Sequence, residues 1–390
     1  MKRSFTFDLA ALLKGTSAVA LAAAVLAISA ADADAQRRNN NNDDDAAEQN
    51  RTVSTEVGET ILEVTELQDQ EQWGQVLQLL NRLINEEELT PYERSIVLQL
   101  RGRSNYATDN IPAAIRDWLG AIDTGALVPD EVNNLRVNIG QLYMAQDNIP
   151  EGIRQIELAL ANGAEQTTAI SQRLAQAYAQ LEDFDGGLRY AERFYNEKQN
   201  KTSGDYALMQ YYYQQLNRPQ DELRVVRARV AAYPGERSPW QSLVSLFARL
   251  ERESEAFEAN KLMYLNGLFE EEDELLRLAQ YYSFFNNPYR GASILEREIN
   301  AGRVEADIEN LELLANMWRQ AQEFERAIPV LERLSRVSGD GENALKLAEA
   351  LYQLNRYGDA EAAFETALER GGLGSDAGNA WNLLGLSRFE

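Results

Sequence analysis

The side chains that could carry chemistry in this chain are almost all carboxylates. Among 390 residues there are 62 Asp and Glu, 38 Lys and Arg, and neither histidine nor cysteine. The chain therefore lacks thiol nucleophiles, Cys/His zinc sites, disulfides and the imidazoles that most often act as general acids and bases. It also has no Gly-rich phosphate loop and no Gly-x-Ser-x-Gly elbow. We predict no catalytic, cofactor-binding or metal-binding residue, and hence a protein that is not an enzyme.

Two runs of carboxylates invite a cation-site interpretation. Asp43-Asp44-Asp45 could be read as a calcium site, but it has no glycine turn, so a solvated spacer is favoured. Glu270 to Glu274 precedes the apolar run Leu275–Leu278. Acidic residues in the first turn of a helix oppose its dipole favourably, so we favour a helix start there over a cation site. Pairs of carboxylates such as Glu253/Glu255 are expected by chance in a chain with 62 acidic residues, so they do not indicate glycosidase-like chemistry.

The net charge of -24 limits the partners. Binding to nucleic acid requires clustered Lys and Arg that neutralise phosphates, and an anionic membrane surface attracts the same residues. We therefore expect no nucleic-acid partner and no anionic membrane surface as a partner. The charge mainly keeps the protein soluble.

The first 35 residues predict export. Lys2, Arg3 and Lys14 precede the uncharged stretch Thr16–Ala31, and Ala33-Asp34-Ala35 offers a small-x-small cleavage pattern, with Ala31-Asp32-Ala33 as a second option. We predict a signal peptide over 1–35 and a periplasmic location, with no integral membrane span after cleavage. An uncleaved inner-membrane anchor is the alternative. Residues 36–52 are rich in Asn and Asp without large apolar residues, which predicts a disordered tether.

A repeat governs the rest of the chain. An apolar, aromatic or proline anchor is usually followed three residues later by a small residue, and successive anchors are 33 to 38 residues apart. The anchor positions are Trp73, Ile111, Ile149, Phe184, Pro219, Glu253, Pro288, Phe324 and Tyr357. Self-similarity at this period predicts stacked helix pairs, here about nine repeats and an incomplete tenth over 53–390. No run alternates with period two, so we expect essentially no sheet.

Local signals predict where several helices begin and end. Thr90-Pro91-Tyr92-Glu93 and Ser238-Pro239-Trp240-Gln241 each combine an N-cap residue, a first-turn proline and an acid or amide at the third helical position. Each is predicted to form a capping box. Glycines between repeats are predicted to separate the helices. These glycines are Gly163, Gly204, Gly267, Gly341 and Gly371-Gly372.

The repeat resembles the tetratricopeptide repeat (TPR). Trp381-Asn-Leu-Leu384-Gly385 matches the opening of its W-x2-L-G signature, and Trp240, Leu243 and Phe247 match it with Val244 at the glycine position. The resemblance implies an all-α, right-handed α-solenoid of antiparallel helix pairs. The small residue in the first helix is expected to let the second helix of the same repeat approach closely, and the small residue in the second helix to do the same for the first helix of the next repeat. We therefore interpret the signature residues, including Trp118, Trp240, Trp318 and Trp381, as core.

A narrower resemblance lies in the C-terminal half. The stretches 310–318, 324–331 and 371–385 are similar to exported TPR proteins encoded beside ExbB, ExbD and TonB components. That resemblance implies a periplasmic accessory of a TonB-type energy-transducing transport system, with TonB/ExbD-type components as partners. The chain stops at Glu390 inside the first helix of a tenth repeat. We expect either further residues after Glu390, which we favour, or a partner that meets Leu383, Leu384 and Leu386.

The first helices of the repeats are expected to line the concave groove that binds a protein partner. Counting back from the anchors places amides, hydroxyls and a few charges there, a set suited to hydrogen bonding with an extended peptide. These residues are Gln172, Gln176, Tyr211, Gln241, Ser245, Gln280, Asn316, Arg319, Glu349 and Tyr352. The alternative is that they are merely solvated. Nearby aromatic residues, among them Tyr211, Phe284 and Phe285, are either exposed anchors or packing between repeats.

The sequence therefore predicts a non-catalytic periplasmic scaffold that binds a protein partner in its groove. The alternative function is a generic envelope scaffold for cell-wall or outer-membrane assembly enzymes. A catalytic domain beyond Glu390 would be needed for an enzyme.

Overall fold

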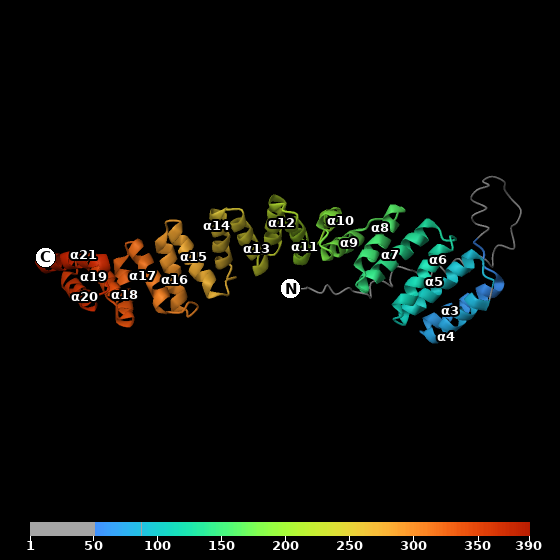
Figure 1. Cartoon of the computed structure of the whole chain (residues 1–390), viewed down its shortest axis with the longest axis horizontal. Coiled ribbons are helices and arrows are strands. Elements are labelled where there is room, and N and C mark those ends of the chain that lie inside the picture. Colours follow the sequence, from blue (N-terminus) through green and yellow to red (C-terminus); the bar gives the residue numbers. More distant parts are fainter. Residues whose placement is uncertain (1–50, 87) are drawn as a thin grey trace. The chain divides into compact units, whose positions relative to one another are not determined.

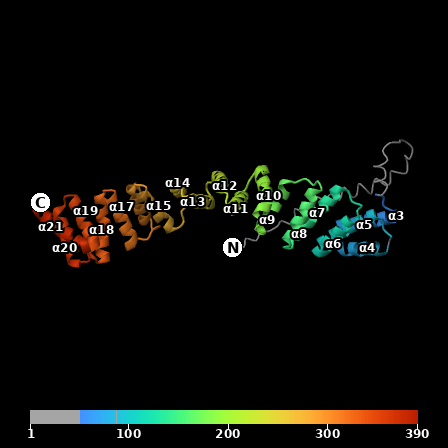
Figure 2. The same ribbon diagram turned by 45° about the horizontal axis from the view of Figure 1, so that its top comes forward.

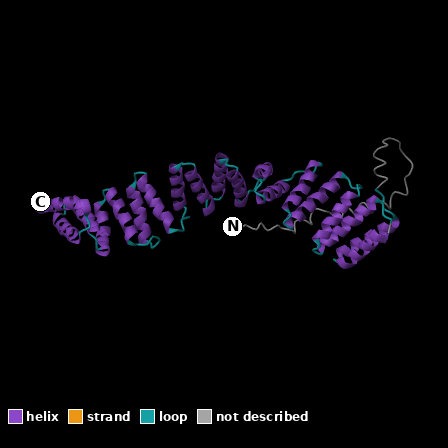
Figure 3. Cartoon of the chain, in the orientation of Figure 1, coloured by secondary structure: helices purple, strands orange, loops and turns teal. Residues whose placement is uncertain are grey.

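The computed structural model describes residues 51–86 and 88–390. These residues form nineteen α-helices and one short 3-10 helix, Gly374–Asp376, joined by short loops, and contain no strand (Figure 3). The predicted all-α class and the absence of sheet are confirmed for this part of the chain. The predicted signal peptide, Asp43–Asp45 and nearly all of the predicted tether lie outside the described residues.

The chain divides into two compact units. In unit 1, whose last residue is Lys201, four helix pairs follow one another along the chain. The pairs are α3 (Thr55–Asp69) with α4 (Trp73–Glu86), α5 (Pro91–Ala107) with α6 (Ile111–Asp123), α7 (Pro129–Ala145) with α8 (Ile149–Ala161), and α9 (Thr168–Gln180) with α10 (Phe184–Glu197). The partners α5 and α6 lie side by side in both ribbon views, as do α7 and α8 (Figures 1 and 2).

Unit 2, Thr202–Glu390, repeats the arrangement with five helix pairs and one further helix. The pairs are α11 (Ser203–Gln215) with α12 (Pro219–Ala232), α13 (Arg237–Arg249) with α14 (Glu253–Leu265), α15 (Glu272–Phe284) with α16 (Pro288–Asn300), α17 (Ile308–Gln320) with α18 (Phe324–Ser338), and α19 (Gly341–Gln353) with α20 (Tyr357–Arg370). The further helix is α21 (Ala377–Phe389). The first and second helices of a pair are its members in chain order.

Every second helix begins at one of the nine anchors. Two residues before each anchor the backbone is left-handed, although none of these residues is glycine. They are Glu71, Asp109, Asp147, Glu182, Asn217, Glu251, Asn286, Gln322 and Asn355, with φ between 51° and 62°. A left-handed residue stops the first helix and reverses the chain within a few residues, so the pairs are antiparallel hairpins.

Small residues set how closely the paired helices approach. A Cβ atom added to Gly140 would lie 2.7 Å from the carbonyl oxygen of Gly152, and one added to Gly291 would lie 2.6 Å from that of Ala279. Both distances are shorter than van der Waals contact, so a methyl group at either glycine would push the helices apart. Close packing at the anchor+3 residues Gly152 and Gly291 is therefore confirmed, but the predicted partner is wrong: each packs against the first helix of its own pair and not against that of the next repeat.

The signature tryptophans are mostly core, with one correction. Trp118, Trp240 and Trp318 are buried, whereas Trp381 is 62% exposed. The prediction that Trp381 is core is therefore wrong for the structure. The helix α21 packs against α20 and buries Ala380 and Leu384, whereas Trp381 lies outside that contact.

The two predicted capping boxes have different outcomes. The Thr90 hydroxyl accepts a hydrogen bond from the Glu93 amide (3.2 Å) and the Glu93 carboxylate accepts one from the Thr90 amide (2.8 Å), so that box is confirmed. The Ser238 box is wrong, because α13 already begins at Arg237. The Ser238 hydroxyl instead accepts a hydrogen bond from Arg229 (3.4 Å).

The predicted glycine separators also differ in detail. Gly163, Gly267 and Gly371 have positive φ and follow second helices, as expected of residues that end a helix. Gly204 instead lies in the first turn of α11, and Gly341 is the first residue of α19.

Candidate protein-binding surface

Successive first helices of unit 2 are joined to one another by polar side chains. The Arg237 guanidinium at the start of α13 pairs with Glu274 of α15 at 2.9 Å. The Asn310 amide of α17 donates to Glu272 of α15 at 3.0 Å. Further along, the Asn343 amide of α19 donates to Glu312 of α17 at 2.9 Å. At the start of the unit, the Ser203 hydroxyl of α11 donates to Glu236, the residue before α13. These contacts link neighbouring first helices from α11 to α19, so we treat their exposed side chains as one surface.

Along this surface runs a row of residues, each eight positions before the start of the second helix. We call Tyr211, Ser245, Gln280 and Asn316 the first-helix row. All four are exposed, Tyr211 by 40%. These four residues present amide and hydroxyl groups, which can both donate and accept hydrogen bonds, and they carry no formal charge. The same register in the last pair of unit 2 is Glu349, which is charged. Such a row suits the backbone of an extended peptide.

The remaining predicted residues of unit 2 differ in how exposed they are. Gln241 is exposed on α13. Arg319 forms an ion pair with Glu349 of the next first helix at 2.7 Å, and both side chains are about three-quarters buried. Tyr352 is half-buried with its ring packed edge-on against Tyr357 at 5.4 Å. Arg319, Glu349 and Tyr352 thus serve the fold, and Gln241 and the first-helix row are the more exposed part of the predicted set.

In unit 1 the predicted residues are Gln172 and Gln176, both half-buried on α9. On the same helix the Tyr178 hydroxyl donates to the Glu157 carboxylate of α8 at 2.7 Å, and the Tyr190 hydroxyl of α10 donates to the same oxygen at 2.8 Å. Burial, followed by the hydrogen bond to Glu157, raises the pKa of Tyr190 to about 12. This cluster links α8, α9 and α10. Both tyrosine hydroxyls stay protonated at physiological pH.

The aromatic residues in the middle of unit 2 divide between packing and exposure. Tyr213 is buried, and Phe285 is half-buried and stacked on Phe257 at 4.8 Å. In contrast, Phe284 is 69% exposed and Tyr289 43% exposed. Of these aromatic residues, Tyr213 and Phe285 therefore pack between helices, whereas Phe284 and Tyr289 are exposed.

The acidic run Glu270–Glu274 is occupied by protein groups. Glu270 and Glu274 both pair with Arg237, and Glu272 accepts hydrogen bonds from the Glu305 amide and the Asn310 side chain. Although burial raises the pKa of Glu274, hydrogen bonds from Arg237 and two backbone amides outweigh it and lower that pKa. The run therefore starts α15 and links first helices. No group of three or more acidic residues in the described part of the chain is arranged to hold a metal ion.

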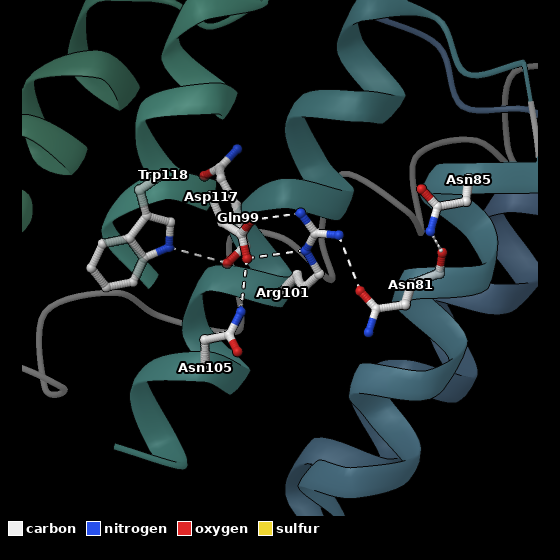
Figure 4. Close-up of polar contacts among 7 residues, drawn as sticks. All are labelled: Asn81, Asn85, Gln99, Arg101, Asn105, Asp117 and Trp118. Carbon is white, nitrogen blue, oxygen red and sulfur yellow. Dashed lines mark hydrogen bonds and ion pairs between the residues drawn. The ribbon is translucent and has the colours of Figure 1, made fainter. Parts of the chain in front are cut away.

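A buried polar network in unit 1 was not anticipated from the sequence. The Arg101 guanidinium of α5 donates two hydrogen bonds to Asp117 of α6, at 2.6 and 3.0 Å, and one to Asn81 of α4 at 3.1 Å (Figure 4). The Asn105 amide donates to the same carboxylate at 2.8 Å, and the Trp118 indole donates to the backbone carbonyl of Gln99 (Figure 4). Because Asp117 is buried with all its oxygens satisfied, the network positions three helices and offers no open site.

Among the helices of the described residues, none is both long enough and apolar enough to cross a membrane.

Comparisons with known proteins agree with the repeat. No protein-family model matches the chain. A segment of 114 residues, 28% of the chain, is 29% identical to tetratricopeptide repeat protein 29 of Homo sapiens, and it spans 24% of that protein. The chain thus matches about a quarter of the length of this curated relative. The match supports a relationship with TPR proteins, in keeping with the helix pairs described above.

Solved structures of TPR proteins also align with the chain. A TPR protein from Parabacteroides merdae aligns over 68% of this chain and 99% of its own, with 11% identity and a TM-score of 0.38. YrrB, a TPR protein with an unusual peptide-binding site, aligns over 44% of this chain and 86% of its own, with 15% identity and a TM-score of 0.37.

Proposed function

We propose that this chain is a non-catalytic scaffold that holds an extended segment of a protein partner against the first-helix row of unit 2. The observation that carries the proposal is the row itself: four exposed, uncharged, hydrogen-bonding side chains at one register of successive helices. A peptide backbone presents donors and acceptors at regular intervals, and a row of hydroxyls and amides can satisfy them without demanding a charge. A chain without histidine or cysteine offers little for catalysis.

The finer proposal is that the scaffold is exported and serves a TonB-type energy-transducing transport system. It is supported by the secretory pattern of residues 1–35 and by the likeness of segments 310–318, 324–331 and 371–385 to exported TPR proteins encoded beside ExbB, ExbD and TonB components. The partner segment would then belong to a TonB-type or ExbD-type component.

Site-specific photo-crosslinking of the exported chain tests both levels. A photoreactive residue at Gln280 or Asn316 should give adducts with one protein, and the same residue at Glu332, exposed on a second helix, should not. Adducts with a TonB-type or ExbD-type component support the finer proposal, whereas adducts with cell-wall or outer-membrane assembly enzymes replace it with a general envelope scaffold. Equal labelling from Glu332 would refute the first-helix row as the binding surface.

The affinity of the identified partner provides the second measurement. The double variant Gln280→Ala/Asn316→Ala should weaken binding at least ~10-fold, in the range of hydrogen-bonding interface residues. Both side chains are exposed, so the unfolding midpoint should not change. Unchanged affinity would mean that these side chains are solvated and do not contact the partner.

A further inference from the structure

One turn of unit 2 departs from the charge pattern of all the others. Around each second-helix start, from four residues before to four after, eight of the nine described hairpins contain at least one Asp or Glu. The exception is the α15–α16 hairpin, whose sequence from 284 to 292 is FFNNPYRGA. In a chain of net charge -24, a hairpin with no acid of its own repels an acidic partner less than the other eight hairpins do.

Ion pairing makes the exception clearer. In three other hairpins of unit 2, the arginine just before the second helix pairs with an acid three residues later: Arg218 with Asp221, Arg252 with Glu255, and Arg356 with Asp359. In the α15–α16 hairpin, the first of these two positions is Asn287 and the second is Arg290. The position that holds the acid in those three hairpins therefore holds a positively charged arginine here.

The charge of Arg290 is left uncompensated. Its guanidinium is exposed and makes no ion pair or hydrogen bond with another residue of the described ranges, although its backbone amide is bonded to Asn287. Arg326 of α18 lies over the Tyr289 ring, 5.5 Å from its centroid, and its ion pair with Glu296 is long at 3.8 Å. Two guanidinium groups therefore border the hairpin, and at least one is available to an anion.

Exposed aromatic rings occupy the same hairpin. Phe284 and Tyr289 flank the turn, 69% and 43% exposed. The hairpin itself is firmly held, because Phe285 stacks on Phe257 of α14 and Tyr289 packs edge-on against Trp318 of α17. Rigid aromatic rings beside arginines are the residue types that dominate protein interfaces, since they bury large areas at a small cost in side-chain entropy.

From these observations we propose that Phe284, Tyr289, Arg290 and Arg326, the α15–α16 turn surface, bind an acidic peptide segment of a protein partner that carries an aromatic or large aliphatic residue. The apolar residue packs against Phe284 and Tyr289, and neighbouring carboxylates pair with Arg290 and Arg326. This surface adjoins the first-helix row, because Phe284 is the last residue of α15 and lies one turn after Gln280. It differs from the row in its aromatic and positively charged residues, so the acidic peptide that it selects goes beyond the function proposed above.

Peptide selection on the full chain tests the proposal. A random dodecapeptide library displayed on phage is selected on the wild-type protein, and the enriched peptides are synthesised with a fluorescent label for anisotropy titrations. We expect net-negative peptides with an aromatic or large aliphatic residue. The variant Phe284→Ser/Arg290→Glu should weaken their binding at least ~10-fold, and added salt should weaken it further.

Two matched variants make the result decisive. Leu265→Ser removes a residue that is 77% exposed at the other end of the neighbouring α14, and it should bind the peptides like the wild type. Arg224→Glu reverses the charge of an exposed arginine on the second helix α12, and it should also leave their binding unchanged. No enrichment, enrichment of neutral or basic peptides, or equal binding by the Phe284→Ser/Arg290→Glu variant would overturn the proposal. Loss of binding in Leu265→Ser or in Arg224→Glu would overturn it as well, because neither residue belongs to this surface.

Discussion

Replacing Glu251 by glycine should stabilise the protein, although glycine usually weakens helical structure. Glu251 lies in the turn after α13 with φ at 56°, and its side chain is exposed. The left-handed conformation costs an L-residue about 1–2 kcal/mol because its Cβ approaches the backbone, and glycine avoids that cost. Glycine loses about 0.5–1 kcal/mol more conformational entropy on folding. The difference predicts a net stabilisation of about 0.5–1 kcal/mol for Glu251→Gly.

Thermal unfolding followed by circular dichroism measures this effect. For a unit of this size, about 1 kcal/mol corresponds to a rise in Tm of about 2–4 °C. Glu251→Gln is the first control, because it removes the charge and retains Cβ, and should leave Tm unchanged. Asn286→Gly, at φ 58°, should gain less than Glu251→Gly, since asparagine tolerates the left-handed region better than glutamate does.

Glu332→Gly is the opposite control. Glu332 is exposed in the middle of α18, where glycine should cost about 1 kcal/mol. If Glu251→Gly is no more stable than Glu251→Gln, or is destabilised like Glu332→Gly, then the turn conformation does not carry the strain assigned to it. The same reasoning would then fail at the other eight turns.

Two further predictions concern packing and pH. Gly291→Ala should destabilise unit 2 by about 1–3 kcal/mol, because its new methyl group would meet the Ala279 carbonyl. Gly358→Ala has open space around the new methyl group and should stabilise the protein by up to about 1 kcal/mol. Urea unfolding of both variants measures the difference. Burial raises the pKa of Glu93, but hydrogen bonds from the Ser54 and Thr90 amides outweigh it, so the folded pKa is lower than the ordinary value of about 4.3. These bonds therefore stabilise the fold above that pH and are lost as the pH falls through the folded pKa. Glu93→Gln should cost about 1–2 kcal/mol at pH 7 and progressively less in acid, and equal losses at pH 7 and pH 3 would contradict this linkage.

The sequence was sufficient to locate the helix pairs, because their packing repeats. Each anchor begins a second helix, and the small residue at Gly152 or Gly291 lies where two backbones meet. A core position of this kind recurs in every repeat, so the spacing of residues within a single sequence is enough to identify it. The failed Ser238 capping box shows the limit of a local signal: α13 already begins at Arg237, so Ser238 is not the N-cap, and its hydroxyl accepts a hydrogen bond from Arg229, nine residues earlier.

The candidate surfaces were harder to predict, since they depend on contacts between repeats. Arg319 occupies a register suited to a partner, yet Glu349, thirty residues later, pairs with it. The Arg101–Asp117 network likewise joins residues whose spacing has no counterpart in the other pairs. The first-helix row could be predicted more directly, because Gln280 and Asn316 recur at one register, are exposed and carry no charge that a neighbouring repeat would neutralise. The register ends at Glu349, where a charge appears and the ion pair with Arg319 follows.

In a repeat protein, adherence to the pattern and departure from it carry different information. Positions that obey the repeat are explained by packing, as the buried Trp318 and Ala327 show. A departure costs stability or solubility without helping the stack. Exposed Phe284 adds apolar surface, and Arg290 stands where three other hairpins of unit 2 have an acid in an internal ion pair. Selection for folding alone would remove both. Their occurrence together in one hairpin, itself anchored by stacked rings, is therefore better explained by a partner than by the fold.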